Sequence, residues 1–368
     1  MRQFMQVLAS LLFFASSLMS SFAFAAPAAR VSWEPVTPID SIRPQLDPLT
    51  LVIRLSDAEG RALSQAAVHV RLEAPQTQTL VSTDFPVVEG SALFDSRVVV
   101  KDGLLPIKIV PPIRGSYRFV VDVDPIGQDA SFAPTRSEWQ AQVGENPAKK
   151  KNLVIFMSIL IGLAAGSGLV LGITRPARTR SRGLVLGAML GTFALGLPSR
   201  SDAHGDEEHG PGQTLESQAK SVTTPSRSGL HLVLDLPTEH PRVGNLSALH
   251  VALLDAQNQL VPARIELSFT QLEHGIEVFR TEAWTPSGTF DWQGQFYDGS
   301  SHQITVRAWP GEQAESLTLT TTIEVEGVAP PPLAVAKSFG SLLALTAAAV
   351  ALGCWLGLSL RNRRELTA

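Results

Sequence analysis

The residues best suited to chemistry lie in one short segment, His204–His209, whose sequence is His-Gly-Asp-Glu-Glu-His. Its two imidazoles and three carboxylates form a ligand set for copper or zinc, because imidazole binds these metals and carboxylates neutralise their charge. The candidate metal ligands are His204, Asp206, Glu208 and His209. Glycine and proline follow the segment directly, so the ligand geometry would form only when the metal binds.

The same segment has two further interpretations. Its acidic and glycine residues are equally typical of a solvated linker between domains. The preceding tripeptide Ser201-Asp-Ala203 has the small residues of a signal-peptidase cleavage site. Cleavage there would make His204 an N-terminus, and its amine and ring nitrogen would then form a copper-binding pair. The sequence leaves all three interpretations open.

Other catalytic and cofactor signatures are missing from the sequence. It contains no HExxH motif, Walker loop or paired-cysteine zinc pattern, and Gly166-Ser-Gly168 lies in an apolar run rather than at a strand-to-helix turn. The single cysteine, Cys354, excludes disulfides within the chain. A net charge of -4 argues against nucleic acid as a partner. We predict that the protein is not an enzyme.

Apolar segments set the position of the candidate ligands relative to a membrane. Residues 1–25 have the charged start, apolar centre and small-residue end of a secretory signal peptide. The runs Leu153–Thr174 and Phe339–Leu360 carry no charge, and each is long enough to cross a hydrocarbon core of ~30 Å. A shorter apolar run near 183–199 would span only with thinning of the bilayer.

The charges that flank these segments indicate an orientation. Arginine clusters at 175–182 and 361–368 would lie in the cytoplasm, in agreement with the positive-inside rule. Lys149, Lys150 and Lys151 oppose the rule, because they fall on the outer side of the first span. The signal peptide and the last arginine cluster agree with each other. We therefore predict a bacterial inner (plasma) membrane protein with its β domains on the exterior, periplasmic side.

Two segments between the apolar runs have the pattern of β domains. Short β-branched runs such as Leu49–Leu55 and Ala248–Leu254 alternate with turns such as Asp102-Gly103 and Asp298-Gly299. Strands with a turn every 8–12 residues or so are typical of an antiparallel sandwich. The predicted fold class is mainly β, with two immunoglobulin-like antiparallel β-sandwich domains joined and anchored by transmembrane α-helices.

The predicted organisation divides the chain into successive segments. They are a signal peptide (1–25), exterior β-sandwich domain 1 (26–148), transmembrane helix 1 (152–174), a cytoplasmic arginine-rich loop (175–182), transmembrane helix 2 or an internal signal-like segment (183–199), a flexible linker rich in histidine and acids (200–227), exterior β-sandwich domain 2 (228–328), transmembrane helix 3 (339–360) and a cytoplasmic tail (361–368).

The two β segments share a local pattern. Leu55-Ser-Asp-Ala-Glu-Gly60 precedes a strand that begins at Ala67, and Leu254-Asp-Ala-Gln-Asn258 precedes one that begins at Ala263. This layout resembles the small periplasmic domains of the FixH and YtkA-like families. Those domains are membrane-tethered sandwiches associated with metal handling and oxidase assembly. The resemblance implies a compartment and a style of protein, and it carries no diagnostic ligand set.

Histidine and aromatic residues concentrate in the second half. Seven of the eight histidines lie at or after His204, which makes this half the better place to look for metal or pH sensitivity. The histidines at 231 and 250 share strand faces with polar or small residues, so we expect them to face outward. An aromatic cluster is expected to be core, with a ligand-stacking edge as the alternative; it comprises Trp284, Phe290, Trp292, Phe296 and Tyr297.

Glycines recur at four-residue spacing in the apolar runs, which lets helix backbones approach closely. The pairs and rows are Gly162/Gly166, Gly168/Gly172, Gly183/Gly187/Gly191 and Gly353/Gly357. The row 183–191 is the strongest candidate, because it could pack on the preceding span. These glycines also make a homo-oligomer conceivable.

The predicted function is that of a non-enzymatic accessory or interaction component of the cell envelope. It would serve a transition-metal efflux or oxidase-assembly system, with the lipid bilayer and envelope membrane proteins as partners. The alternative is a periplasmic metal-binding chaperone or sensor that uses His204–His209. In a third possibility the β domains are spacers and the packed helices carry the function.

Overall fold

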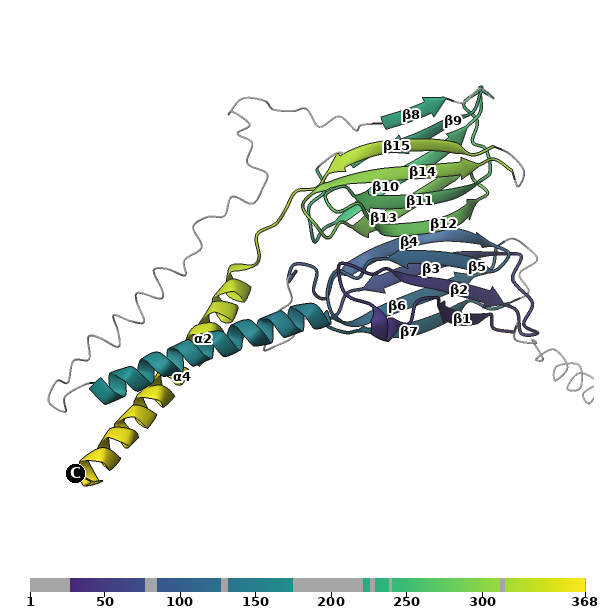
Figure 1. The fold of residues 1–368 in the computed structure, drawn as a ribbon. Coiled ribbons are helices and arrows are strands. Elements are labelled where there is room, and N and C mark those ends of the chain that lie inside the picture. The colour runs from purple at the N-terminus through teal and green to yellow at the C-terminus, as the bar shows by residue number, and fades with distance from the viewer. Residues whose placement is uncertain are drawn as a thin grey trace, which may run out of the picture.

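The computed structural model describes residues 27–76, 85–126, 132–174, 221–225, 229–237, 240–311 and 315–367. Antiparallel strands are the commonest secondary structure in this part of the chain, and two long helices accompany them (Figure 1). The expectation of a mainly β, antiparallel fold is confirmed. The predicted signal peptide, arginine-rich loop and second apolar span lie outside the described residues.

The first unit consists of β1–β7 and a short 3-10 helix. Its elements are β1 (Arg30–Pro35), η1 (Ile39–Ser41), β2 (Leu49–Ser56), β3 (Gln65–Glu73), β4 (Ala92–Lys101), β5 (Leu104–Ile109), β6 (Gly115–Asp124) and β7 (Thr135–Val143). Strands β1-β2-β5 form one layer and β4-β3-β6-β7 the other. Trp33 of β1 packs across the layers on Phe119 of β6 and Trp139 of β7, with ring centroids 6.2 and 5.8 Å away.

The second unit consists of β8–β15. Its strands are β8 (Ser221–Pro225), β9 (His231–Asp235), β10 (Leu246–Leu254), β11 (Ala263–Gln271), β12 (Ile276–Thr285), β13 (Thr289–Gln295), β14 (Ser301–Trp309) and β15 (Leu317–Glu324). One layer is β8-β9-β10-β13 and the other is β12-β11-β14-β15. Strand β8 lies within the range predicted as flexible linker and pairs along its whole length with β9, so the sheet begins earlier than expected.

The two units repeat the same wiring. The pairs β2–β5, β3–β4, β3–β6 and β6–β7 correspond to β10–β13, β11–β12, β11–β14 and β14–β15. The shared sequence pattern forms the same turn in both. One carboxylate oxygen of Asp57 accepts the N–H groups of Glu59 and Arg61, and Asp255 accepts those of Gln257 and Gln259. The local repeat is therefore a repeat of structure.

The two units join edge to edge along a boundary that we call the seam. Strand β5 pairs with β12, and β4 meets β13 at a single bridge between Phe94 and Gly294. Two long paths of paired strands therefore run through both units, β1-β2-β5-β12-β11-β14-β15 and β7-β6-β3-β4-β13-β10-β9-β8 (Figure 1). A bridge between Trp284 of β12 and Val99 of β4 links the two paths. Because β4 corresponds to β12 and β5 to β13, the seam has the self-complementary layout of a twofold interface.

The β5–β12 ladder is short for an identifiable reason. It covers only the pairs from Ile109–Phe279 to Ile107–Thr281. The next residue of β5, Pro106, has no N–H to donate, and its carbonyl accepts the Thr281 hydroxyl at 3.2 Å. Beyond this point β5 and β12 are no longer paired, which opens the groove described below.

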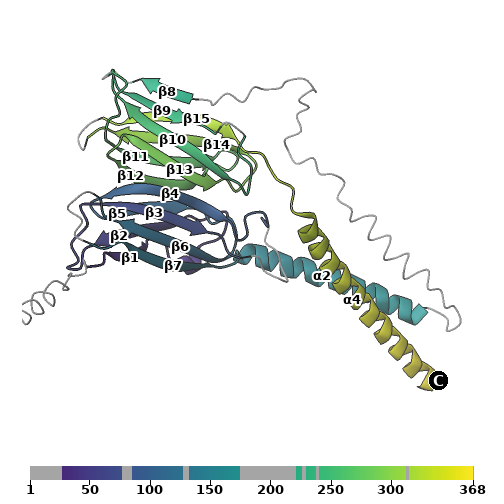
Figure 2. The same cartoon turned by 180° about the vertical axis from the view of Figure 1, so that it is seen from behind.

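Helices α2 (Pro147–Thr174) and α4 (Pro332–Thr367) extend from the same end of the body (Figure 2). Both are long and apolar enough to cross a membrane, and both begin earlier than the spans predicted at 152–174 and 339–360. They cross with backbone contact: a Cβ added at Gly172 would lie 2.5 Å from the carbonyl oxygen of Cys354, and one at Gly357 would lie 2.5 Å from that of Leu169.

Two of the predicted glycine pairs therefore lie at the crossing, Gly168/Gly172 and Gly353/Gly357. The pair Gly162/Gly166 meets nothing within 4 Å. The row 183–191, which the sequence favoured, lies outside the described residues.

Candidate functional site

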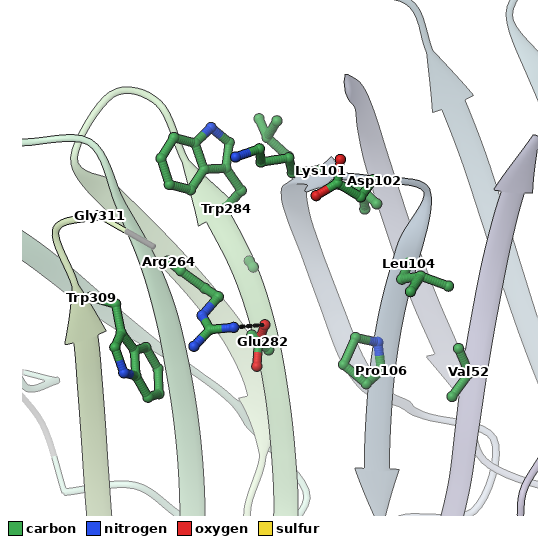
Figure 3. A pocket seen from close by; sticks show the side chains of 13 residues that line it. Val52, Lys101, Asp102, Leu104, Pro106, Arg264, Glu282, Trp284, Trp309 and Gly311 are labelled. Carbon is green, nitrogen blue, oxygen red and sulfur yellow. Dashed lines mark ion pairs between the residues drawn. The ribbon is translucent and has the colours of Figure 1, made fainter. Parts of the chain in front are cut away.

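A groove of about 490 Å³ lies on the outer surface of the seam, where β5 and β12 part. Its wall on the first unit includes the apolar side chains of Val52, Leu104 and Pro106, and the charged residues Lys101 and Asp102 also line it. On the second unit, Trp284 of β12 and Trp309 of β14 form the aromatic part of the wall (Figure 3). Neither unit alone forms this groove, because its walls come from both sides of the seam.

Charged side chains lie against both indole rings. The Arg264 guanidinium carbon is 4.4 Å from the centre of the Trp309 ring, and its Nη1 is 3.6 Å from Oε1 of Glu282 (Figure 3). From the first unit, Lys101 places its Nζ 5.0 Å from the centre of the Trp284 ring. Such cation–π contacts hold both ring planes in place. The groove therefore presents fixed aromatic planes beside an apolar floor.

Aromatic, apolar and charged side chains all line this groove. The described lining residues also include an amine, from Lys101, and two carboxylates, from Asp102 and Glu282. Aromatic walls with a few charged groups are typical of grooves that hold extended or proline-containing peptide segments. The indole nitrogen of Trp284 is buried and has no hydrogen-bond partner among the described residues.

A second groove, of about 630 Å³, crosses the seam on the opposite sheet face. A histidine–aspartate pair from each unit lines it. His69 Nε2 lies 2.6 Å from Oδ1 of Asp95, and His250 Nδ1 lies 2.6 Å from Oδ1 of Asp291. Asp235 of β9 stands opposite His250 in register and completes an acidic lining.

The metal site predicted from the sequence, His204–His209, lies outside the described residues. Within the described residues, no group of three or more histidine, cysteine, aspartate or glutamate side chains is arranged to hold a metal ion. The paired histidines of the second groove therefore do not replace the predicted ligand set. His69 was not singled out by the sequence, because its partner Asp95 is on a neighbouring strand.

The histidines of the second unit are in different environments. His231 and His250 are partly exposed on the outer sheet surface, as expected from their strand faces. His302 is instead buried, with 1% of its surface exposed. Its ring lies 5.1 Å from that of Phe296, and its Nδ1 is 3.0 Å from the Ser300 carbonyl oxygen. Burial lowers the pKa of His302 below its ordinary value.

Core packing of the aromatic cluster is confirmed for three of its residues, and a ligand-stacking edge stays a prediction. Phe290, Trp292 and Phe296 are each 2% exposed and belong to the core. Trp292 packs at 4.7 Å on Phe269 of the opposite layer. Trp284 is only half-buried and lines the groove at the seam.

An ion cluster joins the units beside the β5–β12 ladder. Lys108 Nζ lies 2.5 Å from one oxygen of Glu277, and Arg280 Nη2 lies 2.5 Å from the other. Burial alone would raise the pKa of Glu277, but the hydrogen bonds from Lys108 and Arg280 outweigh it, and the pKa lies below its ordinary value. The carboxylate therefore stays charged at the seam.

No protein-family model and no curated protein matches the chain. Among solved structures, it is similar to trypsin-activated alpha-2-macroglobulin from Escherichia coli, at 11% identity and a TM-score of 0.23 over 82% of this chain and 18% of that chain. Methylamine-reacted alpha-2-macroglobulin from Salmonella is 10% identical, with a TM-score of 0.21 over 83% of this chain and 17% of that chain. The native E. coli protein is 8% identical, with a TM-score of 0.23 over 83% of this chain and 17% of that chain. The chain thus spans less than a fifth of their length, and at such TM-scores the likeness carries no argument.

Proposed function

We propose that this chain is a non-enzymatic interaction protein of the bacterial cell envelope. Helices α2 and α4 anchor it in the inner membrane. Its two units are immunoglobulin-like β-sandwich domains that stand together as one body on the periplasmic side. The groove at the seam is the surface that receives a partner, an extended segment of an envelope protein.

The observation that carries the anchoring is the exposure of apolar side chains along α2, outside the face that meets α4. Leu153, Phe156, Ile159 and Leu163 are each more than half exposed, at 59%, 57%, 58% and 67%. A soluble protein rarely exposes a continuous apolar surface of this size. A lipid environment covers such side chains, and a helix of 28 residues is long enough to cross it.

The immunoglobulin-like assignment is supported by one buried tyrosine. The Tyr117 hydroxyl on β6 donates to the Ile113 carbonyl at 2.5 Å and accepts the Ile113 N–H at 3.0 Å. A tyrosine that bonds to the backbone a few residues upstream is typical of immunoglobulin-like sandwiches. Burial raises the pKa of Tyr117 above its ordinary value, so the hydroxyl stays neutral.

The topology is tested by labelling single cysteines in intact cells. In a Cys354→Ser background, Gln65→Cys, Thr318→Cys and Asn362→Cys each place a thiol at an exposed position in the first unit, the second unit and the tail. A membrane-impermeant maleimide should label the first two in spheroplasts and the third only after permeabilisation. Equal labelling of all three, or recovery of the chain in the soluble fraction, would contradict the proposal.

The binding role of the groove is tested by a photocrosslinking amino acid at Leu104, which is 43% exposed in the groove. Leu260, 49% exposed on a turn that does not line the groove, is the matched control. We expect a discrete adduct from position 104 only, and its loss with Trp309→Ala. Equal adducts from both positions would show that the groove is not the docking surface.

Metal binding by His204, Asp206, Glu208 and His209 is a second proposal, favoured by the concentration of imidazole and carboxylate in that segment. Such binding would fit service to a transition-metal or oxidase-assembly system. Titration calorimetry of the full chain with Cu(II) and Zn(II) tests it. Sub-micromolar binding that disappears with His204→Ala plus His209→Ala supports the site, and binding that this change leaves unaltered rejects it.

A further inference from the structure

The first unit is joined to α2 by a short, hydrogen-bonded connection. Asn146 is buried and caps the helix, with its Oδ1 accepting the Ala148 N–H at 3.0 Å. Pro147 follows at the first helical position, where its missing N–H costs nothing. Next to this cap, Arg114 and Glu145 form an ion pair. The direction of α2 relative to the first unit is therefore set by the cap.

A loop of the first unit, residues 43–47, lies beside the first turn of α2. At its centre, Gln45 has a φ of 68°, a conformation that side chains other than glycine rarely adopt. Its N–H donates to the Pro111 carbonyl at 2.8 Å, and its side-chain amide donates to the Pro112 carbonyl at 3.2 Å. Lys149 of α2 donates to Gln45 Oε1 at 3.0 Å. The loop is thus held against the start of the helix.

We call this region the rim; it consists of residues 43–47 and 145–151. Its two carboxylates are already engaged, Asp47 by Arg43 at 2.7 Å and Glu145 by Arg114. The exposed lysines at 149, 150 and 151 therefore give the rim a net positive charge. Leu46 stands beside them and is 45% exposed. The rim thus places basic and apolar side chains beside the start of the apolar part of α2.

We propose that the rim binds the anionic headgroups of the membrane in which α2 is anchored. The lysines contact phospholipid phosphates, and Leu46 enters the headgroup layer. This inference rests on the proposed membrane anchoring. It also accounts for the lysines that oppose the positive-inside rule. Each basic residue near an anionic membrane surface strengthens the binding of the protein to that surface by about fivefold. The first unit then lies on the bilayer, and the second unit stands farther out.

The test uses the full chain in nanodiscs. In a Cys354→Ser background, an environment-sensitive dye on Leu46→Cys reports whether the loop enters lipid. Its emission should shift to the blue when about 30% phosphatidylglycerol replaces phosphatidylcholine, and high salt should reverse the shift. Lys150→Gln plus Lys151→Gln should abolish the shift while keeping the Lys149–Gln45 hydrogen bond. The matched control, Arg30→Gln plus Arg97→Gln, removes two exposed charges from strands away from the rim and should leave it intact.

A dye at Ile159→Cys separates this inference from the proposed function. If Ile159 is in lipid and Leu46 gives a water-like signal in both membranes, the rim does not bind headgroups although the anchoring stands. A phosphatidylglycerol shift that survives loss of both lysines also overturns the inference. If both dyes report water, the membrane anchoring itself is wrong.

Discussion

The two units have the same strand wiring but differ in how they connect to the helices. The first unit continues directly into α2 through the Asn146 cap. The second unit is tied at Glu326, whose carboxylate is 3.0 Å from Arg242, and then reaches α4 through Ala329-Pro-Pro-Pro332. Only the first attachment holds a unit and a helix as one piece. The contacts at the seam therefore position the second unit against the first.

The cores differ as well, although the topology repeats. In the first unit the aromatic rings close the edge farthest from the seam, where Trp33 stacks on Trp139 at 5.8 Å. In the second unit they gather close to the seam, and Phe279 meets Phe94 of the first unit at 5.3 Å. The second unit also buries a histidine, His302, which titrates nearer neutral pH than the buried Tyr117 of the first unit. The first unit should therefore depend less on the seam and on pH than the second.

The largest effect is expected from Phe94→Ala. Phe94 is 2% exposed, and truncating a buried phenylalanine costs about 3–5 kcal/mol of the free energy of unfolding. Because the lost contacts include Phe279 across the seam, denaturant unfolding followed by tryptophan fluorescence should change from one transition to two. Phe119→Ala, in the first unit away from the seam, is the control and should lower stability without separating the units. A single transition for Phe94→Ala would mean that the units remain coupled and that the Phe94–Phe279 contact is not what couples them.

The helix crossing is expected to give the next effect. A side chain at Gly357 would meet the backbone of Leu169 and Gly172, so Gly357→Val should cost about 1–3 kcal/mol through overpacking. Thermal unfolding of the full chain in detergent would measure this as a lower Tm. Gly162→Val is matched in volume change and meets nothing within 4 Å, so it should have little effect. Equal loss from both variants would exclude a specific crossing.

The sequence predicts the elements well and their assembly poorly. Alternation within Ala248–Leu254 predicts β10, and the turn at Asp255 predicts its end, because both signals are local. The groove escapes such prediction, since Lys101, Arg264 and Trp309 lie on three strands that are distant in the chain. Trp284 is the lining residue that the sequence places in a candidate cluster. The seam itself depends on which strand edges meet, and an edge has no sequence period of its own.

A pH effect in the second unit should be intermediate in size. The pKa of His302 is lowered by burial, so the folded state binds its proton less readily than the unfolded state. Stability from this group is complete above its ordinary pKa of 6.5 and falls below that pH, by at most about 1.4 kcal/mol per pH unit. His302→Phe keeps a ring beside Phe296 and should make the denaturation midpoint less dependent on pH below pH 6.5. His231→Phe, on the surface, should not.

The smallest effect should come from the ion cluster at the seam, and its pH window is different. The pKa of Glu277 is lowered, so its contribution is present above the ordinary value of 4.5 and is lost as the pH falls through the lower folded value. Glu277→Gln should reduce the free energy of unfolding by about 1 kcal/mol at neutral pH and weaken the dependence below pH 4.5. Glu266→Gln, in an ion pair with Arg307 away from the seam, is the control. Because stability from His302 begins to fall near pH 6.5, a pH titration of the wild-type chain distinguishes the effect of His302 in the second core from that of Glu277 at the seam. A loss confined to the lower window, and absent from Glu277→Gln, would show that the seam, and not the second core, is the acid-sensitive part.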